Sequence, residues 1–266
     1  MTFSVVFHDR ETKTWGVGVA SKFISVGSVV PWAKAGHGAV ATQSFSNYSY
    51  GPHGLELLRD KDASTVLNLL TSDDPLRETR QAAVVDRNGN VAAHTGSKCM
   101  DFAGHITGDG FSVQGNILAG REVIEAMAKE MEKGGPVLER ILRTLEAGDS
   151  KGGDRRGRQS AAILIATEGK PFEEFSDRWV DLRVDDSIEP FKEMRKLSLL
   201  WEATFFDQEM VSIKDHEAEI NPALKKAGYS SLREWADNNN FTDKVTELKI
   251  GDKVLEALVT GARSEW

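Results

Sequence analysis

The sequence has 266 residues, with 33 lysines and arginines against 41 aspartates and glutamates, so its formal net charge at pH 7 is −8. This length predicts one large domain, or one domain with a small appendage. Hydrophobic residues make up 40% of the chain and charged residues 28%. That composition excludes intrinsic disorder as the global state and allows a full core without disulfides or structural metal.

The cysteine content and the charge pattern limit the compartment and the partners. Cys99 is the only cysteine, so neither an intramolecular disulfide nor a thiolate zinc cage can form, and a reducing compartment is expected. Residues 1–10 lack the features of a signal peptide, and no segment approaches the roughly 20 apolar residues of a bilayer span. We therefore expect a soluble, cytoplasmic protein with no membrane partner. The one basic cluster, at residues 155–158, is too short for a duplex, so no nucleic-acid partner is expected.

The first part of the chain predicts two hairpins and two short helices. Residues 2–7 and 15–20 are rich in β-branched and aromatic residues and flank a polar turn, as in an antiparallel hairpin. Residues 38–43 predict a third strand, and Pro52 marks the first turn of a helix over 51–58, which a second helix around 63–70 follows. Residues 81–86 and 91–95 flank an Asn-Gly pair, which favours a tight hairpin turn.

The second part alternates helices with strands. It predicts a strand over 110–114, an amphipathic helix over 121–133, a further helix over 137–145, and a strand over 160–166 whose continuous apolar run indicates burial on both faces. Apolar residues at helical spacing continue from 187 to 206. The simplest packing of these elements is a layered α/β domain with sheets in the middle and helices outside.

The C-terminal tail predicts a separate small unit. A charged stretch around residues 215–219 suggests a boundary, so we expect a main domain over 1–210 and a small helical unit over 211–266. The tail carries enough apolar residues to pack on itself, on the main domain or at a contact between subunits of a homo-oligomer.

Thr2 is the first candidate for chemistry. An initiator methionine is generally removed before a small second residue, which would leave a hydroxyl and a free α-amine on the same residue. The α-amine has an ordinary pKa of about 7.7 to 8.0, so it can accept the hydroxyl proton near neutral pH, and a nearby cation such as Lys22 would lower that pKa. The opening hairpin returns Ser21 and Lys22 to the level of Thr2. The alternative is that Thr2 only begins an edge strand and Lys22 is a solvated charge.

Six blocks of the chain form one dispersed pattern, at residues 2–6, 15–23, 26–33, 50–55, 114–120 and 152–162. Together they resemble one family, domain of unknown function 1028. This family is placed among the N-terminal-nucleophile hydrolases, which implies a four-layer αββα sandwich and hydrolysis of an amide bond by an N-terminal Thr, Ser or Cys. The matching nucleophile here is Thr2. Where proteasome-like members use an acidic residue beside the lysine, this sequence has Ser21.

An acyl-transfer site also needs donors for the oxyanion. We expect Gln114, Gly115 and Asn116 to form a loop that supplies backbone and side-chain N–H groups. The alternative is a turn in which Gly115 has a backbone conformation that other residues avoid and Asn116 caps the next helix. Gln43 and Asn47 are weaker candidates of the same kind.

A charged loop offers a place for substrate. Asp154 could orient a neighbour while Arg155 or Arg158 binds a substrate carboxylate. The alternative, about equally supported, is an ion pair between Asp154 and one of the arginines that only holds the loop. His53 is a further substrate-binding candidate, although a lone histidine is more often structural. No histidine has the spacing of a metal ligand, so we expect no metal and no cofactor.

Two other interpretations stay open. Cys99 beside Lys98 could be a nucleophile, although a small, half-buried residue is the simpler interpretation. Residues 224–229 and 235–241 resemble a segment described as peptidoglycan-binding in some relatives of the family, but a cytoplasmic chain has little use for that ligand. We predict a hydrolase of an amide or amide-like bond in a small molecule. The alternative is a catalytically inactive binding or assembly module with the same fold.

Overall fold

The computed structural model describes residues 2–169 and 176–262, and it divides into two compact units, 1–194 and 195–266. The division falls within helix α5 (Pro190–Phe205). Among its described residues, the first unit has two antiparallel sheets and four α-helices before α5. The chain therefore has a mixed α/β fold.

A six-stranded sheet forms the centre of the first unit. Its strand order is β10-β9-β2-β1-β8-β7, and every neighbouring pair is antiparallel. The bounds are β1 (Thr2–Asp9), β2 (Thr14–Ser21), β7 (Gly104–Gly108), β8 (Phe111–Asn116), β9 (Ser160–Thr167) and β10 (Arg178–Val184). The predicted opening hairpin is thus β1–β2, and it occupies the middle of the sheet because β8 and β9 flank it.

A four-stranded sheet packs against the first. Its order is β3-β4-β5-β6, with β3 (Pro31–Lys34), β4 (Gly38–Ser44), β5 (Arg80–Asp86) and β6 (Val91–Thr95). The predicted Asn-Gly hairpin is β5–β6, with Gly89 at a positive φ of 82°. Small and β-branched side chains, among them Val17 and Val19 from one sheet and Ala41 and Val85 from the other, fill the space between the sheets.

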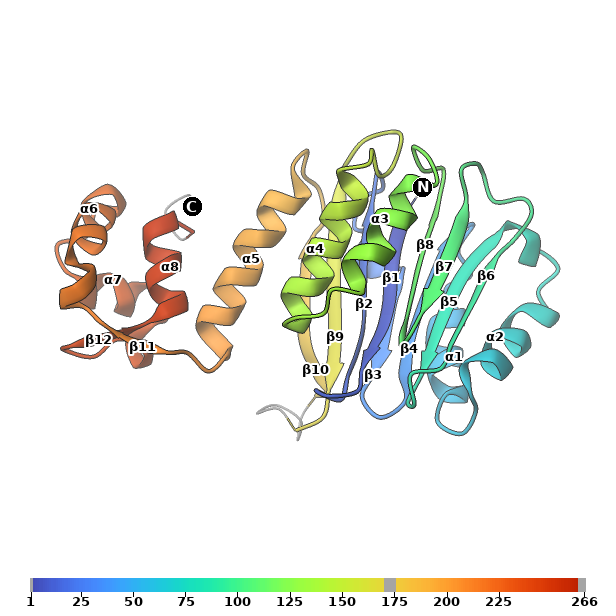
Figure 1. Cartoon of the computed structure of the whole chain (residues 1–266), viewed down its shortest axis with the longest axis horizontal. Helices are drawn as coiled ribbons and strands as arrows, with labels where there is room; N and C mark the ends of the chain where they lie inside the picture. The colour runs from blue at the N-terminus through green and yellow to red at the C-terminus, as the bar shows by residue number, and fades with distance from the viewer. Residues whose placement is uncertain (1, 170–175, 263–266) are drawn as a thin grey trace. The chain divides into compact units, whose positions relative to one another are not determined.

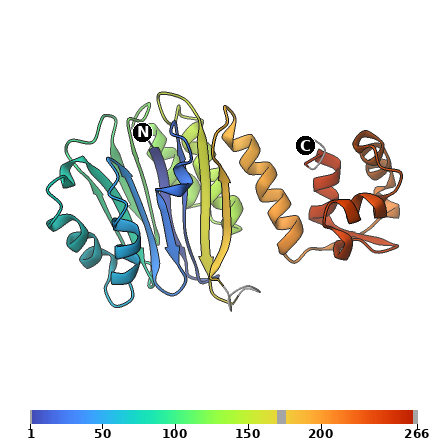
Figure 2. The ribbon, with the colours of Figure 1, turned by 180° about the vertical axis from the view of Figure 1, so that it is seen from behind.

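Pairs of helices cover the two outer faces. Helices α3 (Glu122–Met131) and α4 (Val137–Asp149) pack on the six-stranded sheet, and α1 (Tyr50–Leu57) and α2 (Ala63–Ser72) pack on the four-stranded sheet. Figures 1 and 2 show these pairs on opposite sides of the unit. Helix α4 approaches β2 closely because Gly18 has no side chain, and a Cβ there would lie 2.4 Å from Ile141.

Within the first unit, the strand prediction differs from the structure in four places. Strands β3, β7 and β10 were not predicted. Residues 114–116, predicted as a loop, are the end of β8. Hydrogen bonding explains this last error, because the segment pairs with β1 on one side and, through residues 114 and 115, with β7 on the other. A Gln-Gly-Asn sequence is typical of a turn only when no neighbouring strands compete for its backbone.

The second unit contains three helices beyond α5 and a short two-stranded sheet. The helices are α6 (Glu217–Ala227), α7 (Leu232–Asn238) and α8 (Asp252–Thr260), and the strands are β11 (Met210–Ser212) and β12 (Lys249–Gly251). Trp235 and Phe241 lie at its core, with ring centroids 5.5 Å apart. Within the described ranges of both units, no helix combines the length and the apolar character that crossing a bilayer requires.

Candidate functional site

The start of β1 and the ends of β2 and β8 lie level with one another at one end of the six-stranded sheet. In the β1–β2 register Phe3 lies opposite Ala20, so Thr2 lies level with Ser21, and their hydroxyl oxygens are 3.2 Å apart. On the other side of β1, Thr2 pairs with Asn116 of β8. The Thr2 side chain is buried, with only 6% of the residue exposed. The hairpin therefore places the candidate nucleophile inside the fold and beside a second hydroxyl.

Thr2 lines a cavity of about 300 Å³ at this end of the sheet. The cavity lies between the end of β4 and the segment that connects β2 to β3. Its other lining residues are Phe23, Val26, Val29, Val30, Gln43, Ser44, Phe45, Ser46, Tyr48 and Arg80. A cavity of this size is at the lower end of the range for small-molecule sites, and such sites combine apolar walls with a few polar groups.

A network of buried carboxamides lies next to Thr2. The Gln43 Nε2 atom is 3.5 Å from the Thr2 carbonyl oxygen and donates to Gln81 Oε1 at 2.8 Å. Asn116 Nδ2 donates to the same Gln81 oxygen at 2.9 Å, and Gln81 Nε2 donates to the Gly115 carbonyl at 2.7 Å. Gln81 therefore fixes the side chains of both Gln43 and Asn116, and all three residues are buried.

The network continues along the space between the sheets. Ser4 donates to Gln43 Oε1 at 2.7 Å, Gln114 Nε2 donates to Ser4 Oγ at 2.6 Å, and Ser112 donates to Gln114 Oε1 at 2.8 Å. Gln114 is thus part of a buried polar chain and does not line the cavity. Of the residues predicted to hold an oxyanion or substrate, Gln43 is the one that the structure brings to both Thr2 and the cavity.

Lys22 and Asp154 meet through the main chain. The Asp154 carboxylate accepts a hydrogen bond from the Lys22 backbone N–H at 2.7 Å, and it also accepts from the Arg156 backbone N–H at 2.9 Å. The Lys22 ammonium donates to the Arg158 carbonyl at 3.1 Å. Asp154 also forms an ion pair with Arg156, 3.4 Å long. An ion pair between Asp154 and an arginine of the loop is therefore present, and the arginine is Arg156.

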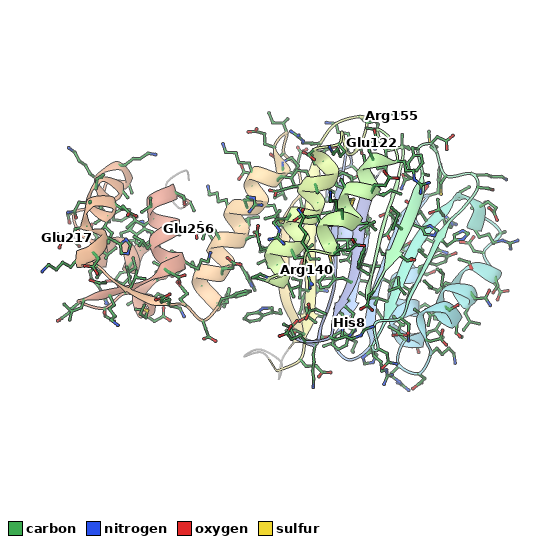
Figure 3. The ribbon with its side chains drawn as sticks, in the orientation of Figure 1. His8, Glu122, Arg140, Arg155, Glu217 and Glu256 are labelled. Carbon is green, nitrogen blue, oxygen red and sulfur yellow. The ribbon has the colours of Figure 1, made fainter. Side chains whose placement is uncertain are left out.

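The remaining predicted residues lie outside the cavity lining. Arg155 is exposed in the loop before β9, where Figure 3 labels it, and its backbone N–H contacts the Ile117 carbonyl at 3.4 Å. His53 is exposed on α1, on the outer side of the four-stranded sheet. Cys99 is buried, and burial raises the pKa of its thiol, which donates to the Arg80 carbonyl at 3.2 Å.

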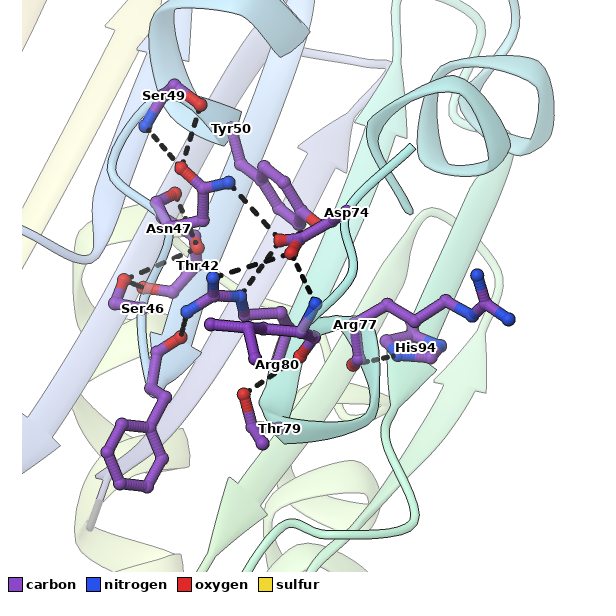
Figure 4. A network of polar contacts seen from close by, with 12 residues as sticks. Thr42, Ser46, Asn47, Ser49, Tyr50, Asp74, Arg77, Thr79, Arg80 and His94 are labelled. Atoms are coloured by element: carbon purple, nitrogen blue, oxygen red, sulfur yellow. Dashed lines mark hydrogen bonds and ion pairs between the residues drawn. The ribbon is translucent and has the colours of Figure 1, made fainter. Parts of the chain in front are cut away.

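A buried carboxylate beside the cavity was not predicted. Asp74 accepts hydrogen bonds from Arg80 Nε at 2.9 Å, from the Tyr50 hydroxyl at 2.9 Å and from Asn47 Nδ2 at 3.2 Å (Figure 4). It also accepts from the Leu76 backbone N–H at 2.8 Å. Burial alone would raise the pKa of Asp74, but these hydrogen bonds, that of Arg80 foremost, hold it well below its ordinary value. Asp74 is therefore ionised and paired at neutral pH.

The hydrogen bond between Asp74 and Tyr50 shifts the two pKa values in opposite directions, because it stabilises the ionised carboxylate and the protonated hydroxyl. Burial and the Asp74 partner raise the pKa of the Tyr50 hydroxyl, which stays protonated as a donor.

Gln81 and Arg80 were not identified from the sequence as site residues, because they begin a strand that looks apolar. Gln81 itself was the feature in the sequence that could have indicated the network, since a buried, uncharged polar side chain needs a hydrogen-bond partner.

In residues 2–169 and 176–262, no group of three or more His, Cys, Asp or Glu side chains is arranged to hold a metal ion.

Comparison with known proteins gives a family. The model of the Family of unknown function (DUF1028) matches residues 2–194. A crystal structure of a protein from Silicibacter pomeroyi, described under the same family model, superimposes with a TM-score of 0.67 at 31% sequence identity, covering 74% of this chain and 87% of that one. A search of the curated proteins finds no match. The chain therefore belongs to the DUF1028 family, and the matched region contains all the residues of the candidate site.

Proposed function

We propose that the chain is an N-terminal-nucleophile hydrolase with an αββα core, and that Thr2 cleaves an amide or amide-like bond of a small molecule. The observation that carries the proposal is the position of Thr2. It begins the central strand of a sheet, it is buried, and it lines a cavity of ligand size. The two stacked sheets with helices outside each, and the resemblance of the sequence blocks to that superfamily, support the proposal.

The reaction begins with the removal of the residue before Thr2. Met1 lies outside the described residues. Its loss would give Thr2 a free α-amine, and a buried amine has a lowered pKa because burial disfavours its charged form. The neutral amine then accepts the hydroxyl proton while Oγ1 attacks the amide carbonyl carbon. The C–N bond breaks, the leaving nitrogen takes the proton, and water hydrolyses the resulting ester on Thr2.

Two neighbouring side chains have roles in this proposal. The Ser21 hydroxyl, 3.2 Å from that of Thr2, orients the nucleophile. Gln43 Nε2 has two hydrogens, and one is held by Gln81 at 2.8 Å. The second faces the Thr2 carbonyl across 3.5 Å, a long contact that can be exchanged for an oxyanion. Gln81 and Asn116 are positioning residues, because they act through Gln43 and through the β1–β8 pairing.

Hydrolysis of a panel of small amides by three variants tests the proposal. Thr2→Ala should lose turnover, because removing the nucleophile's oxygen removes the covalent step, whereas Thr2→Ser should keep part of it. Thr14→Ala is the matched control, since Thr14 is equally buried at the opposite end of the neighbouring strand. Thermal unfolding of each variant checks folding.

Turnover by wild type should rise with pH through the pKa of the α-amine, below the ordinary range of about 7.7 to 8.0. Turnover by Thr2→Ala at the wild-type rate would remove Thr2 from the mechanism. Complete absence of hydrolysis in the wild-type protein with a free Thr2 amine would favour the binding-module alternative.

A further inference from the structure

Three exposed aromatic side chains border the Thr2 cavity. Phe23, Phe45 and Tyr48 have 46%, 66% and 55% of their surface exposed, and all three line the cavity together with Val26, Val29 and Val30. A single exposed aromatic residue needs no explanation, but a group of them around one cavity marks a binding surface. Phe23 comes from the segment after β2, and Phe45 and Tyr48 come from the segment after β4.

The backbone of Phe45 is held in place on both sides. Its N–H donates to the Thr79 carbonyl at 3.2 Å, and its carbonyl accepts from the Arg80 guanidinium. Ser44, immediately before it, has a φ of +69°, a left-handed conformation that costs a non-glycine residue free energy and persists only where the surroundings impose it. The exposure of the Phe45 ring therefore results from a fixed backbone and not from a loose loop.

The other two aromatic residues follow the same pattern. The carbonyl of Asn47, next to Tyr48, accepts from the Thr42 hydroxyl at 3.2 Å, and the Asn47 amide donates to Asp74 (Figure 4). The Phe23 carbonyl accepts a hydrogen bond from the Ser160 hydroxyl. Ser25, two residues after Phe23, has a φ of +53°. Both segments are thus anchored by side chains of the sheet, and they present their rings in set positions.

The charge in the cavity is already neutralised. Arg80 is the one lysine, arginine, aspartate or glutamate among the described residues that line the cavity, and its guanidinium pairs with Asp74 at 2.9 Å. The two side chains are only 13% and 7% exposed, so the pair is largely removed from water and its net charge is zero. Because Asp74 already compensates the charge of Arg80, an anionic ligand gains less attraction here than from a free arginine, and it still loses its hydration. The walls therefore select for an uncharged ligand.

We propose that the cavity recognises the ring-bearing, apolar part of a neutral small amide, held by Phe23, Phe45 and Tyr48. The inference rests on the proposed function only in placing that apolar group next to the bond that Thr2 attacks. The preference for a ring follows from the aromatic walls, because aromatic pairs gain energy beyond the area that they bury. The preference for a neutral group follows from the Arg80–Asp74 pair.

Binding measured without catalysis tests this inference separately from the hydrolase proposal. The protein is the full-length Thr2→Ala variant, and calorimetric titrations use 3-phenylpropanamide, its isosteric anion 3-phenylpropanoate, and propanamide, which lacks the ring. The titrations are run at pH 9, where a free α-amine is largely neutral, so that only the cavity walls distinguish the probes. We expect 3-phenylpropanamide to bind at least tenfold more tightly than either of the other two.

Substitutions show whether the aromatic rings are responsible. Phe45→Ala and Tyr48→Ala should each weaken 3-phenylpropanamide about tenfold. The control Leu69→Ala, which removes an exposed apolar side chain from α2 outside the cavity, should leave the affinity unchanged. Equal or tighter binding of 3-phenylpropanoate, no binding of 3-phenylpropanamide, or an affinity that Phe45→Ala leaves unaltered would each overturn the inference.

The outcomes also distinguish the two proposals. Selective binding of 3-phenylpropanamide keeps the inference even if wild-type protein with a free Thr2 amine hydrolyses no amide of the panel, and that absence of hydrolysis contradicts the hydrolase proposal. Turnover of aliphatic or charged amides, with no binding of 3-phenylpropanamide, contradicts the inference and keeps the hydrolase.

Discussion

Replacing Asp74 with asparagine should destabilise the fold while leaving the shape of the side chain nearly unchanged. The carboxylate oxygens divide their partners. Oδ2 accepts from Arg80 Nε, Tyr50 and Asn47, and Oδ1 accepts from the Leu76 N–H and, at 3.5 Å, from a second Arg80 nitrogen. An asparagine can keep the first set only by turning its NH₂ group toward Leu76. It therefore loses at least one buried hydrogen bond and all of the negative charge.

The size of the effect follows from the burial of the pair. Removing one partner of a buried ion pair costs roughly 3–5 kcal/mol, because the remaining charge is left without compensation. Arg80 keeps 13% of its side-chain surface in water and its bond to the Phe45 carbonyl, which places the expected loss at about 3 kcal/mol, the low end of that range. Asp73→Asn is the control, because Asp73 is the exposed neighbour; its effect should be below about 0.5 kcal/mol.

Urea unfolding of the full chain at several pH values measures this difference. The folded-state pKa of Asp74 lies below its ordinary value of 3.8. Its contribution to stability is therefore complete above that value and is lost as the pH falls through the lower folded-state pKa. The gap between wild type and Asp74→Asn should stay constant from neutral pH to about pH 5 and shrink only below pH 4. A gap under 1 kcal/mol at pH 7, or one that closes between pH 7 and pH 5, would show that the Asp74 carboxylate does not stabilise the fold in this way.

Three further substitutions test other parts of the structure. Gln81→Met leaves buried amide donors unpaired and should lower the free energy of unfolding by about 2–3 kcal/mol in urea titrations. The control Gln159→Met, where the amide lies near the surface, should change the free energy of unfolding by less than about 0.5 kcal/mol. Equal effects of the two substitutions would contradict a stabilising role of the Gln81 network. Cys99→Ser should leave any amide turnover unchanged, and the native thiol should react slowly with an alkylating reagent at pH 8, because burial raises its pKa; fast reaction would show an accessible thiolate. Gly51→Ala should lower the melting temperature, because its Cβ would lie 2.2 Å from the Trp32 ring and overpacking costs about 1–3 kcal/mol; an unchanged melting temperature would show that α1 shifts freely.

The local patterns predicted much of the first unit. The opening hairpin, the Asn-Gly hairpin and the helices over 121–133 and 137–145 all have counterparts in the structure, because each is determined by residues close together in the chain. Strand β10 (Arg178–Val184) alternates between exposed and buried residues over most of its length, so its signal was present. Strand β7 (Gly104–Gly108) begins and ends with glycine, and its pairing with β8 depends on the rest of the sheet.

The site was only partly predictable for the same reason. The hairpin register placed Ser21 beside Thr2 from the sequence alone, since both residues belong to one local element. Gln81 and the Asp74–Arg80 pair could not be found in that way. Gln81 meets Gln43 through the β4–β5 pairing, and it meets Asn116 across the space between the two sheets. No local pattern encodes which buried amides face each other.

In the proposed mechanism Thr2 has a free amine and forms an ester with the acyl group of its substrate. Peptide mass spectrometry can detect both features in protein from its native host that is acid-quenched during reaction with 4-nitrophenyl 3-phenylpropanoate. We predict an N-terminal peptide that begins at Thr2 and carries one acyl group that hydroxylamine removes. An N-terminal peptide that keeps Met1, or an acyl group found on Cys99 instead, would exclude Thr2 as the nucleophile.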